Sequence, residues 1–165
     1  MMMKARRVLK TAVAGVTNRT KDGKYITFLD YDEIPYEWLR DELLAIQKEF
    51  DLKQLYVFKS GSDNHHVICF EKMNREDYEK ILHRSSCDPG YKKIPWAWGK
   101  RVSTLRISEK RGTVPKFLEI IDRDAIPMRE LSSAHIKFFS KYYTVPLPLG
   151  MGDGEEELIM VRYRI

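Results

Sequence analysis

Residues 25–32 read Tyr-Ile-Thr-Phe-Leu-Asp-Tyr-Asp and form the most informative stretch of this sequence. The run is β-like, and residues two apart on a strand point to the same side. Asp30 and Asp32 therefore project from one face, close enough to share a divalent cation. Carboxylates on a rigid strand suit Mg²⁺ or Mn²⁺, which serve phosphoryl and nucleotidyl transfer. The alternative is a strand that runs out into a polar loop, with both acids solvated.

Periodicity and turn residues predict the elements around this strand. The order is strand, helix, strand, strand, helix, strand, at residues 25–30, 38–50, 54–59, 66–70, 75–84 and 102–108. This is a ferredoxin-like or RRM-like βαββαβ pattern, an antiparallel sheet with both helices on one face. Additions follow as a strand, a helix and a final strand, at residues 117–121, 128–142 and 157–163. We expect residues 87–99 to be irregular, and residues 8–16 to form either a strand or a short helix.

The length predicts one domain, and the order of the predicted elements makes it an α+β domain with a core at about residues 24–111 and a C-terminal extension at about residues 112–165. The chain has 165 residues, of which 43% are hydrophobic, so it can bury a core without disulfide or zinc staples. Cys69 and Cys87 lack metal-type spacing, which favours a reduced, cytoplasmic protein. No apolar stretch approaches the ~20 residues that cross a bilayer, so we expect no membrane partner.

The predicted topology gathers polar side chains at one edge of the sheet. In a ferredoxin-like sheet the first and third strands are central neighbours, and the face without helices is free to bind a ligand. Carboxylates hold metal, while Lys, Ser, His and Arg donate to phosphate oxygens that the metal also contacts. The residues predict a site for a divalent metal and a nucleoside triphosphate. Its candidates are Asp30, Asp32, Lys59, Ser60, His65, His66, Arg106 and Lys110.

Three short motifs, in this order, resemble those of the archaeo-eukaryotic primase superfamily, which occurs in archaea, eukaryotes, plasmids and viruses. They are FLDYD (residues 28–32), SGSDNHHV (residues 60–67) and TLRISEK (residues 104–110). The resemblance covers about residues 24–111, close to a minimal catalytic core. It implies a primase-polymerase-like domain in DNA replication, which transfers nucleotides from (d)NTPs on a nucleic-acid template. It also leaves room for a helicase or an accessory subunit as partner.

The same resemblance implies roles for individual residues. Asp30 and Asp32 match the catalytic acids that bind Mg²⁺ or Mn²⁺, and Ser60 with His65 or His66 matches the nucleotide-phosphate binders. We favour His66, because the family's histidine usually leads directly into the apolar strand.

The third motif departs from the family. Family members usually carry a third metal-binding acid there, where this sequence has Arg106. Glu109, Asp122 and Asp124 are the acids that could substitute, and none of them stands in a matching strand context. Binding without catalysis therefore stays an open interpretation.

Basic residues cluster in the second half of the chain. The net charge of +5 is a mild bias, but residues 92–116 interleave lysines and arginines with aromatic side chains. That combination is typical of a nucleic-acid binder, whereas the alternative is a solvated basic loop. The candidates for binding a DNA template, or RNA, are Trp96, Trp98, Lys100, Arg101 and Arg111.

Two other functions share the predicted fold. A rolling-circle replication nuclease of the HUH type would use His65 and His66 as metal ligands and Tyr78 as nucleophile. Adjacent histidines on a strand point to opposite sides, which disfavours this alternative. A non-catalytic RRM-like module would stack bases on Phe28 and Phe70 from the open face of the sheet.

Overall fold

The predicted strand at the two aspartates forms as β2 (Tyr25–Tyr31), at one edge of a four-stranded antiparallel sheet. The computed structural model describes residues 12–97, 102–110, 112–126, 128–143 and 160–164. The sheet has the order β2-β4-β3-β6, in which β3 spans Gln54–Gly61, β4 spans Asn64–Met73 and β6 spans Lys116–Asp122. β4 thus lies between β2 and β3, the arrangement of a split βαβ unit.

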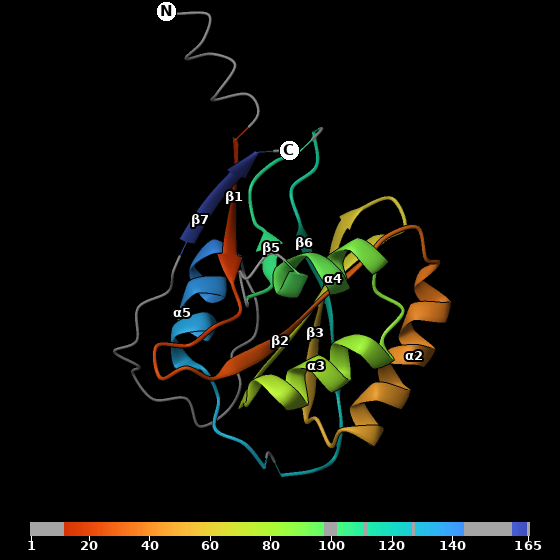
Figure 1. The fold of residues 1–165 in the computed structure, drawn as a ribbon. Coiled ribbons are helices and arrows are strands. Elements are labelled where there is room, and N and C mark those ends of the chain that lie inside the picture. Colours follow the sequence, from red (N-terminus) through yellow and green to blue (C-terminus); the bar gives the residue numbers. More distant parts are fainter. Residues whose placement is uncertain (1–11, 98–101, 111, 127, 144–159, 165) are drawn as a thin grey trace, which may run out of the picture.

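Two helices cover one face of this sheet, as the sequence predicts (Figure 1). Helix α2 (Tyr36–Glu49) buries Leu39, Leu43 and Ile46 at helical spacing. Helix α3 (Arg75–Arg84) begins after Asn74, whose side-chain oxygen accepts a hydrogen bond from the Asp77 amide at 2.8 Å. Such a cap satisfies one of the free amides at a helix start and stabilises the helix by about 1 kcal/mol.

The opposite face is also covered, which contradicts the expectation of an open, ligand-binding face. A second sheet of order β5-β1-β7, with strands Thr104–Arg106, Ala12–Thr17 and Met160–Arg164, lies there with helix α5 (Ser133–Tyr142) (Figure 1). Phe28 and Phe70 are fully buried beneath Phe139 of α5. An RRM-like module that stacks bases on these two rings is therefore excluded.

The α+β class with antiparallel sheets is confirmed, but the specific βαββαβ arrangement is not. The predicted fourth core strand shortens to β5 and pairs with β1, while β6 takes the outer position beside β3. β2 is consequently an edge strand rather than a central one. The short length of β5 explains part of the difference. A strand of three residues forms few ladder hydrogen bonds, so its pairing with the larger sheet would stabilise that sheet less than the pairing of the longer β6.

Other boundaries move for identifiable local reasons. Residues 87–99, expected to be irregular, contain helix α4 (Pro89–Ala97), and the Asp88 carboxylate accepts from the amides of Gly90 and Tyr91 at its start. β3 extends to Gly61 and β4 begins at Asn64, so the turn between them is shorter than predicted. Asp63 in this turn has a positive φ of 54°. No helix in the described ranges is long and apolar enough to span a membrane.

Candidate functional site

A polar cavity of about 510 Å³ lies where β2, β3 and β4 meet β5 and the turn that follows β5. It gathers six of the predicted site residues, which come from segments far apart in the sequence. They are Asp30, Asp32, Ser60, His66, Arg106 and Lys110. The remaining lining residues are Glu33, Gly61, Ser62, Asn64, Thr104 and Thr113.

Strand register explains this convergence. Asp30 lies opposite His66 in the β2–β4 pair, and His66 lies opposite Phe58 in the β4–β3 pair. Ser60 follows Phe58 by two residues, so it projects from the same face. Tyr31 points to the other face and is buried under the helices, which leaves Asp30 and Asp32 together on the cavity side.

Lys59 and His65 lie on the opposite face from the cavity. Lys59 and His65 are partners in the β3–β4 register, and the His65 ring stacks on Tyr36 of α2 at a centroid distance of 5.0 Å. Neither residue lines the cavity. The adjacent histidines thus point to opposite faces, as strand geometry requires, and cannot hold one metal ion as an HUH-type nuclease would.

Tyr78 does not fit the role of a nucleophile either. Its hydroxyl is buried, donates to the Phe28 carbonyl at 2.7 Å and lies 2.8 Å from Ser103 Oγ. Burial raises the pKa of this phenol above its usual range. The HUH alternative therefore lacks both its metal ligands and its attacking group.

The cavity perturbs the titration of its acids and its histidine. Burial raises the pKa of Asp30 to about 6, against the opposing charge of Arg106. Burial and the neighbouring Asp30 raise the pKa of Asp32 as well. His66 Nε2 lies 3.6 Å from Asp30 Oδ1, yet burial and Arg106 lower the pKa of His66 to about 3. At neutral pH the carboxylate of Asp30 is charged and the imidazole is neutral.

Asp88 is a third acid near the pair, which the sequence analysis did not identify. Its amide donates to the Asp30 carbonyl at 3.4 Å, and its charge raises the pKa of both Asp30 and Asp32. Its carboxylate caps the start of α4. The sequence Asp-Pro-Gly at residues 88–90 is a signal for a helix start, and it could have identified Asp88 as an ordered acid.

The acids considered as substitutes lie elsewhere. Asp122 pairs with Lys53 at 2.9 Å and is opposite Gln54 in register, at the end of the sheet away from the cavity. Asp124 follows it, and Glu109 is exposed and does not line the cavity. No group of three or more potential metal ligands occurs in the described part of the chain.

The donor set nevertheless fits a magnesium-like ion that brings other ligands with it. Mg²⁺ in nucleotide sites binds through one or two carboxylates, with the remaining positions taken by water and substrate phosphates. Asp30 and Asp32 supply that number. Burial destabilises their charged forms without a cation, as the raised pKa values indicate, so a divalent ion would offset an electrostatic penalty already present.

Arg106 has a structural role that the sequence did not predict. Its guanidinium donates to the carbonyls of Ser108, of Thr113 at 2.8 Å and of Ser60 at 3.1 Å. It therefore ties the turn after β5 to the end of β3. Lys110 and Thr113 exchange backbone hydrogen bonds at 3.0 Å in that turn, which holds Lys110 at the cavity.

Replacing Arg106 by lysine is expected to loosen this turn, because an ammonium cannot reach three carbonyls in a fixed fork. We expect a loss of about 1–3 kcal/mol in the free energy of unfolding and faster hydrogen exchange at the Lys110 and Thr113 amides. Chemical denaturation and exchange mass spectrometry measure both. Arg40→Lys is the control, since Arg40 pairs with Glu119 at the surface. Equal effects of the two changes would contradict the assignment.

The predicted nucleic-acid residues mostly lie outside the described ranges. This holds for Trp98, Lys100, Arg101 and Arg111. Trp96 belongs to α4 by its backbone, and its side chain is not among those described.

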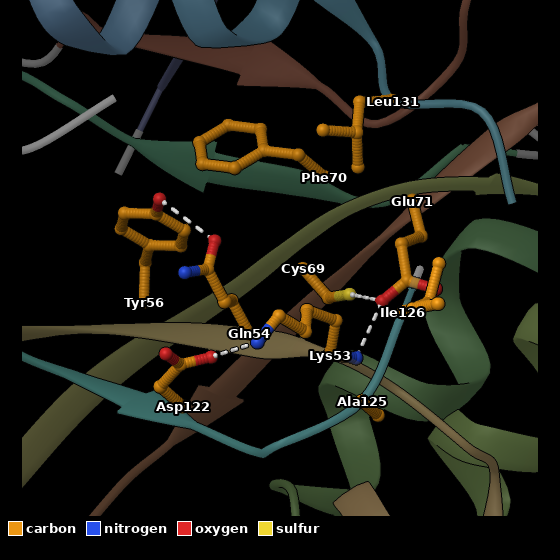
Figure 2. A pocket seen from close by; sticks show the side chains of 10 residues that line it. All are labelled: Lys53, Gln54, Tyr56, Cys69, Phe70, Glu71, Asp122, Ala125, Ile126 and Leu131. Carbon is orange, nitrogen blue, oxygen red and sulfur yellow. Dashed lines mark hydrogen bonds and ion pairs between the residues drawn. The ribbon is translucent and has the colours of Figure 1, made fainter. Parts of the chain in front are cut away.

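A second cavity, of about 280 Å³, opens at the other end of the sheet (Figure 2). Its walls include Tyr56 and Phe70, and Glu71 is a buried acid in its lining. The Glu71 carboxylate accepts from the Lys53 amide at 2.8 Å and lies 3.3 Å from Cys69 Sγ. These polar groups satisfy one another, and burial raises the pKa of the Cys69 thiol, so this cavity lacks an activated nucleophile.

Comparison of the chain with protein-family models, with curated proteins and with solved structures found no match in any of the three.

Proposed function

We propose that this chain is a primase-polymerase-like domain, which binds a metal–nucleoside triphosphate and transfers nucleotides on a nucleic-acid template. The observation that carries the proposal is the meeting of two groups in one cavity. Asp30 and Asp32 form an acidic side, and Ser60, His66 and Lys110 form a side that donates hydrogen bonds or positive charge. This is the layout that a metal-bound triphosphate requires.

Each side chain of the cavity has a role that its chemistry supports. Asp30 and Asp32 would hold Mg²⁺ or Mn²⁺, which on binding neutralises phosphate charge and polarises the reacting phosphoryl group. The Ser60 hydroxyl and the neutral His66 imidazole are each more than nine-tenths buried, and both line the cavity. Each can donate one hydrogen bond to a phosphate oxygen. Lys110 adds a positive charge beside them.

The size and position of the cavity support a nucleotide-sized ligand. A volume of about 510 Å³ falls within the ~300–1,000 Å³ typical of small-molecule sites. Its lining is polar throughout, which suits a phosphate group rather than an apolar ligand. Several lining residues belong to the β3–β4 turn and to the turn after β5, so the cavity lies at the end of these strands, where a template strand could approach.

The test compares the two adjacent histidines. We expect His66→Gln to weaken Mn²⁺-dependent nucleotide binding by about 10-fold or more, because it alters a hydrogen bond to a charged group. His65→Gln should change the affinity less than about threefold, since its ring packs on Tyr36. Fluorescent-nucleotide titration measures affinity, and a primer-template assay with Mg²⁺ or Mn²⁺ measures extension.

Thermal melts of both variants separate misfolding from lost contacts. Equal affinities in the two variants would contradict the site. Nucleotide binding without extension would restrict the function to binding.

A further inference from the structure

We infer that a hollow beside the polar cavity is the path along which a single-stranded nucleic acid reaches it. The inference rests on the proposed function, and it assigns the nucleic-acid template to a particular surface. Lys59 and Lys116 line this hollow, which has a volume of about 570 Å³. Neither lysine lines the polar cavity, and neither is part of the motifs that resemble the primase superfamily. Lys59 directly precedes the second of those motifs, which begins at Ser60.

The two lysines form an unfavourable pair in the isolated protein. They are direct partners in the β3–β6 register, and both side chains are exposed. Like charges directly opposite each other on neighbouring strands destabilise a sheet. No ion pair to either lysine occurs within the described residues, and the nearby Glu119 is engaged by Arg40 and by the Tyr36 hydroxyl. A polyanion that contacts both lysines would remove this repulsion.

The hollow is continuous with the cavity in its lining. Gly61, Ser62 and Thr113 line both, so the β3–β4 turn and the turn after β5 form the shared border. Lys59 lies on the opposite face of the sheet from the cavity, so a chain that contacts Lys59 and Lys116 would pass over this shared border to reach the acids.

Apolar side chains line the hollow together with the two lysines, which favours a nucleic acid over a purely acidic polypeptide. Val114 and Leu118 are each about two-fifths exposed, and Phe117 is half-buried against Phe58. Single-stranded nucleic acid presents phosphates to cations and flat base faces to apolar side chains.

The test uses the full chain and a fluorescein-labelled single strand of about 12 nucleotides, a length within known site sizes. We compare the wild type with Lys59→Gln/Lys116→Gln by fluorescence anisotropy over a range of salt concentrations. Each phosphate contact contributes ~0.7 to the logarithmic salt slope, so losing two should lower the slope by about 1.4. At about 0.1 M salt this corresponds to roughly 25-fold weaker binding.

Lys48→Gln/Lys80→Gln is the matched control, because it removes two exposed lysines from α2 and α3. It should change affinity less than about twofold. Unchanged slope and affinity in the Lys59/Lys116 variant, or no binding of the strand by the wild type, would overturn the inference. Equal competition by polyglutamate would overturn it in favour of an acidic polypeptide.

The same titrations distinguish this inference from the proposed function. The Lys59/Lys116 variant should retain metal-dependent nucleotide binding, and Asp30→Asn should retain binding of the strand. The lysine variant could lose binding of the nucleic acid while Asp30→Asn keeps full nucleotide affinity. That result would support the nucleic-acid path and refute the nucleotide site.

Discussion

Asp30→Asn is expected to reduce metal-dependent nucleotide affinity by at least about 100-fold and to abolish any primer extension. Even changes to groups behind metal ligands lower metal affinity ~10–100-fold, so loss of a ligand should reach the top of that range. Asparagine keeps the size of the side chain and removes its charge. Isothermal titration with a nucleotide in Mn²⁺ measures the affinity directly. Asp124→Asn is the control, because it removes an exposed acid that does not line the cavity.

The same variant should be more stable than the wild type when a chelator removes divalent ions. The folded pKa of Asp30, about 6, lies above its ordinary value of 3.8. Between those values the folded chain keeps a proton that the unfolded chain releases, so rising pH favours unfolding. The stability gain of Asp30→Asn should therefore be absent below about pH 4, grow toward pH 6 and stay constant above it.

We expect a gain on the order of 1–2 kcal/mol at neutral pH, because one pKa unit corresponds to 1.36 kcal/mol and the partly exposed side chain is screened by solvent. Urea unfolding at several pH values measures it. Undiminished nucleotide affinity in Asp30→Asn would refute the site. A stability difference that does not depend on pH would refute the electrostatic account of Asp30.

Phe139→Ala is expected to destabilise the fold by about 3–5 kcal/mol, the range for a large aromatic side chain removed from a core. The Phe139 ring is buried, and its centroid lies 6.0–6.1 Å from those of Phe28, Phe58 and Phe70. It therefore joins α5 to three strands of the larger sheet. The expected fall in Tm is about 10 °C for a chain of this size.

Trp38→Ala is the control for this prediction. Trp38 lies on α2, and its side chain is 76% exposed. Its replacement should change stability by less than about 0.5 kcal/mol, as for most surface positions. A small effect of Phe139→Ala would mean that α5 does not close this face. The RRM-like reading of Phe28 and Phe70 would then return.

Local patterns were sufficient for part of the site. Alternation along residues 25–32 predicts that Asp30 and Asp32 share a face, and the same rule separates His65 from His66. These expectations hold because the side-chain period of a strand is a property of the backbone itself. Helices α2 and α3 were predictable for a similar reason, since their apolar stripes and the Asn74 cap are encoded within single segments.

Tertiary structure decided which segments meet. The short strand β5 could pair with the edge of the larger sheet or with β1, and nothing within residues 102–108 distinguishes the two. Contacts between distant segments bury Phe28, and they bring the Asp88 amide to the Asp30 carbonyl. Contacts of the same kind let the Arg106 guanidinium donate to the Ser60 carbonyl. The sequence by itself determined which side chains face together on each element. Choice among partners depends on the total area buried and the hydrogen bonds satisfied by the whole chain, so no local pattern contains it.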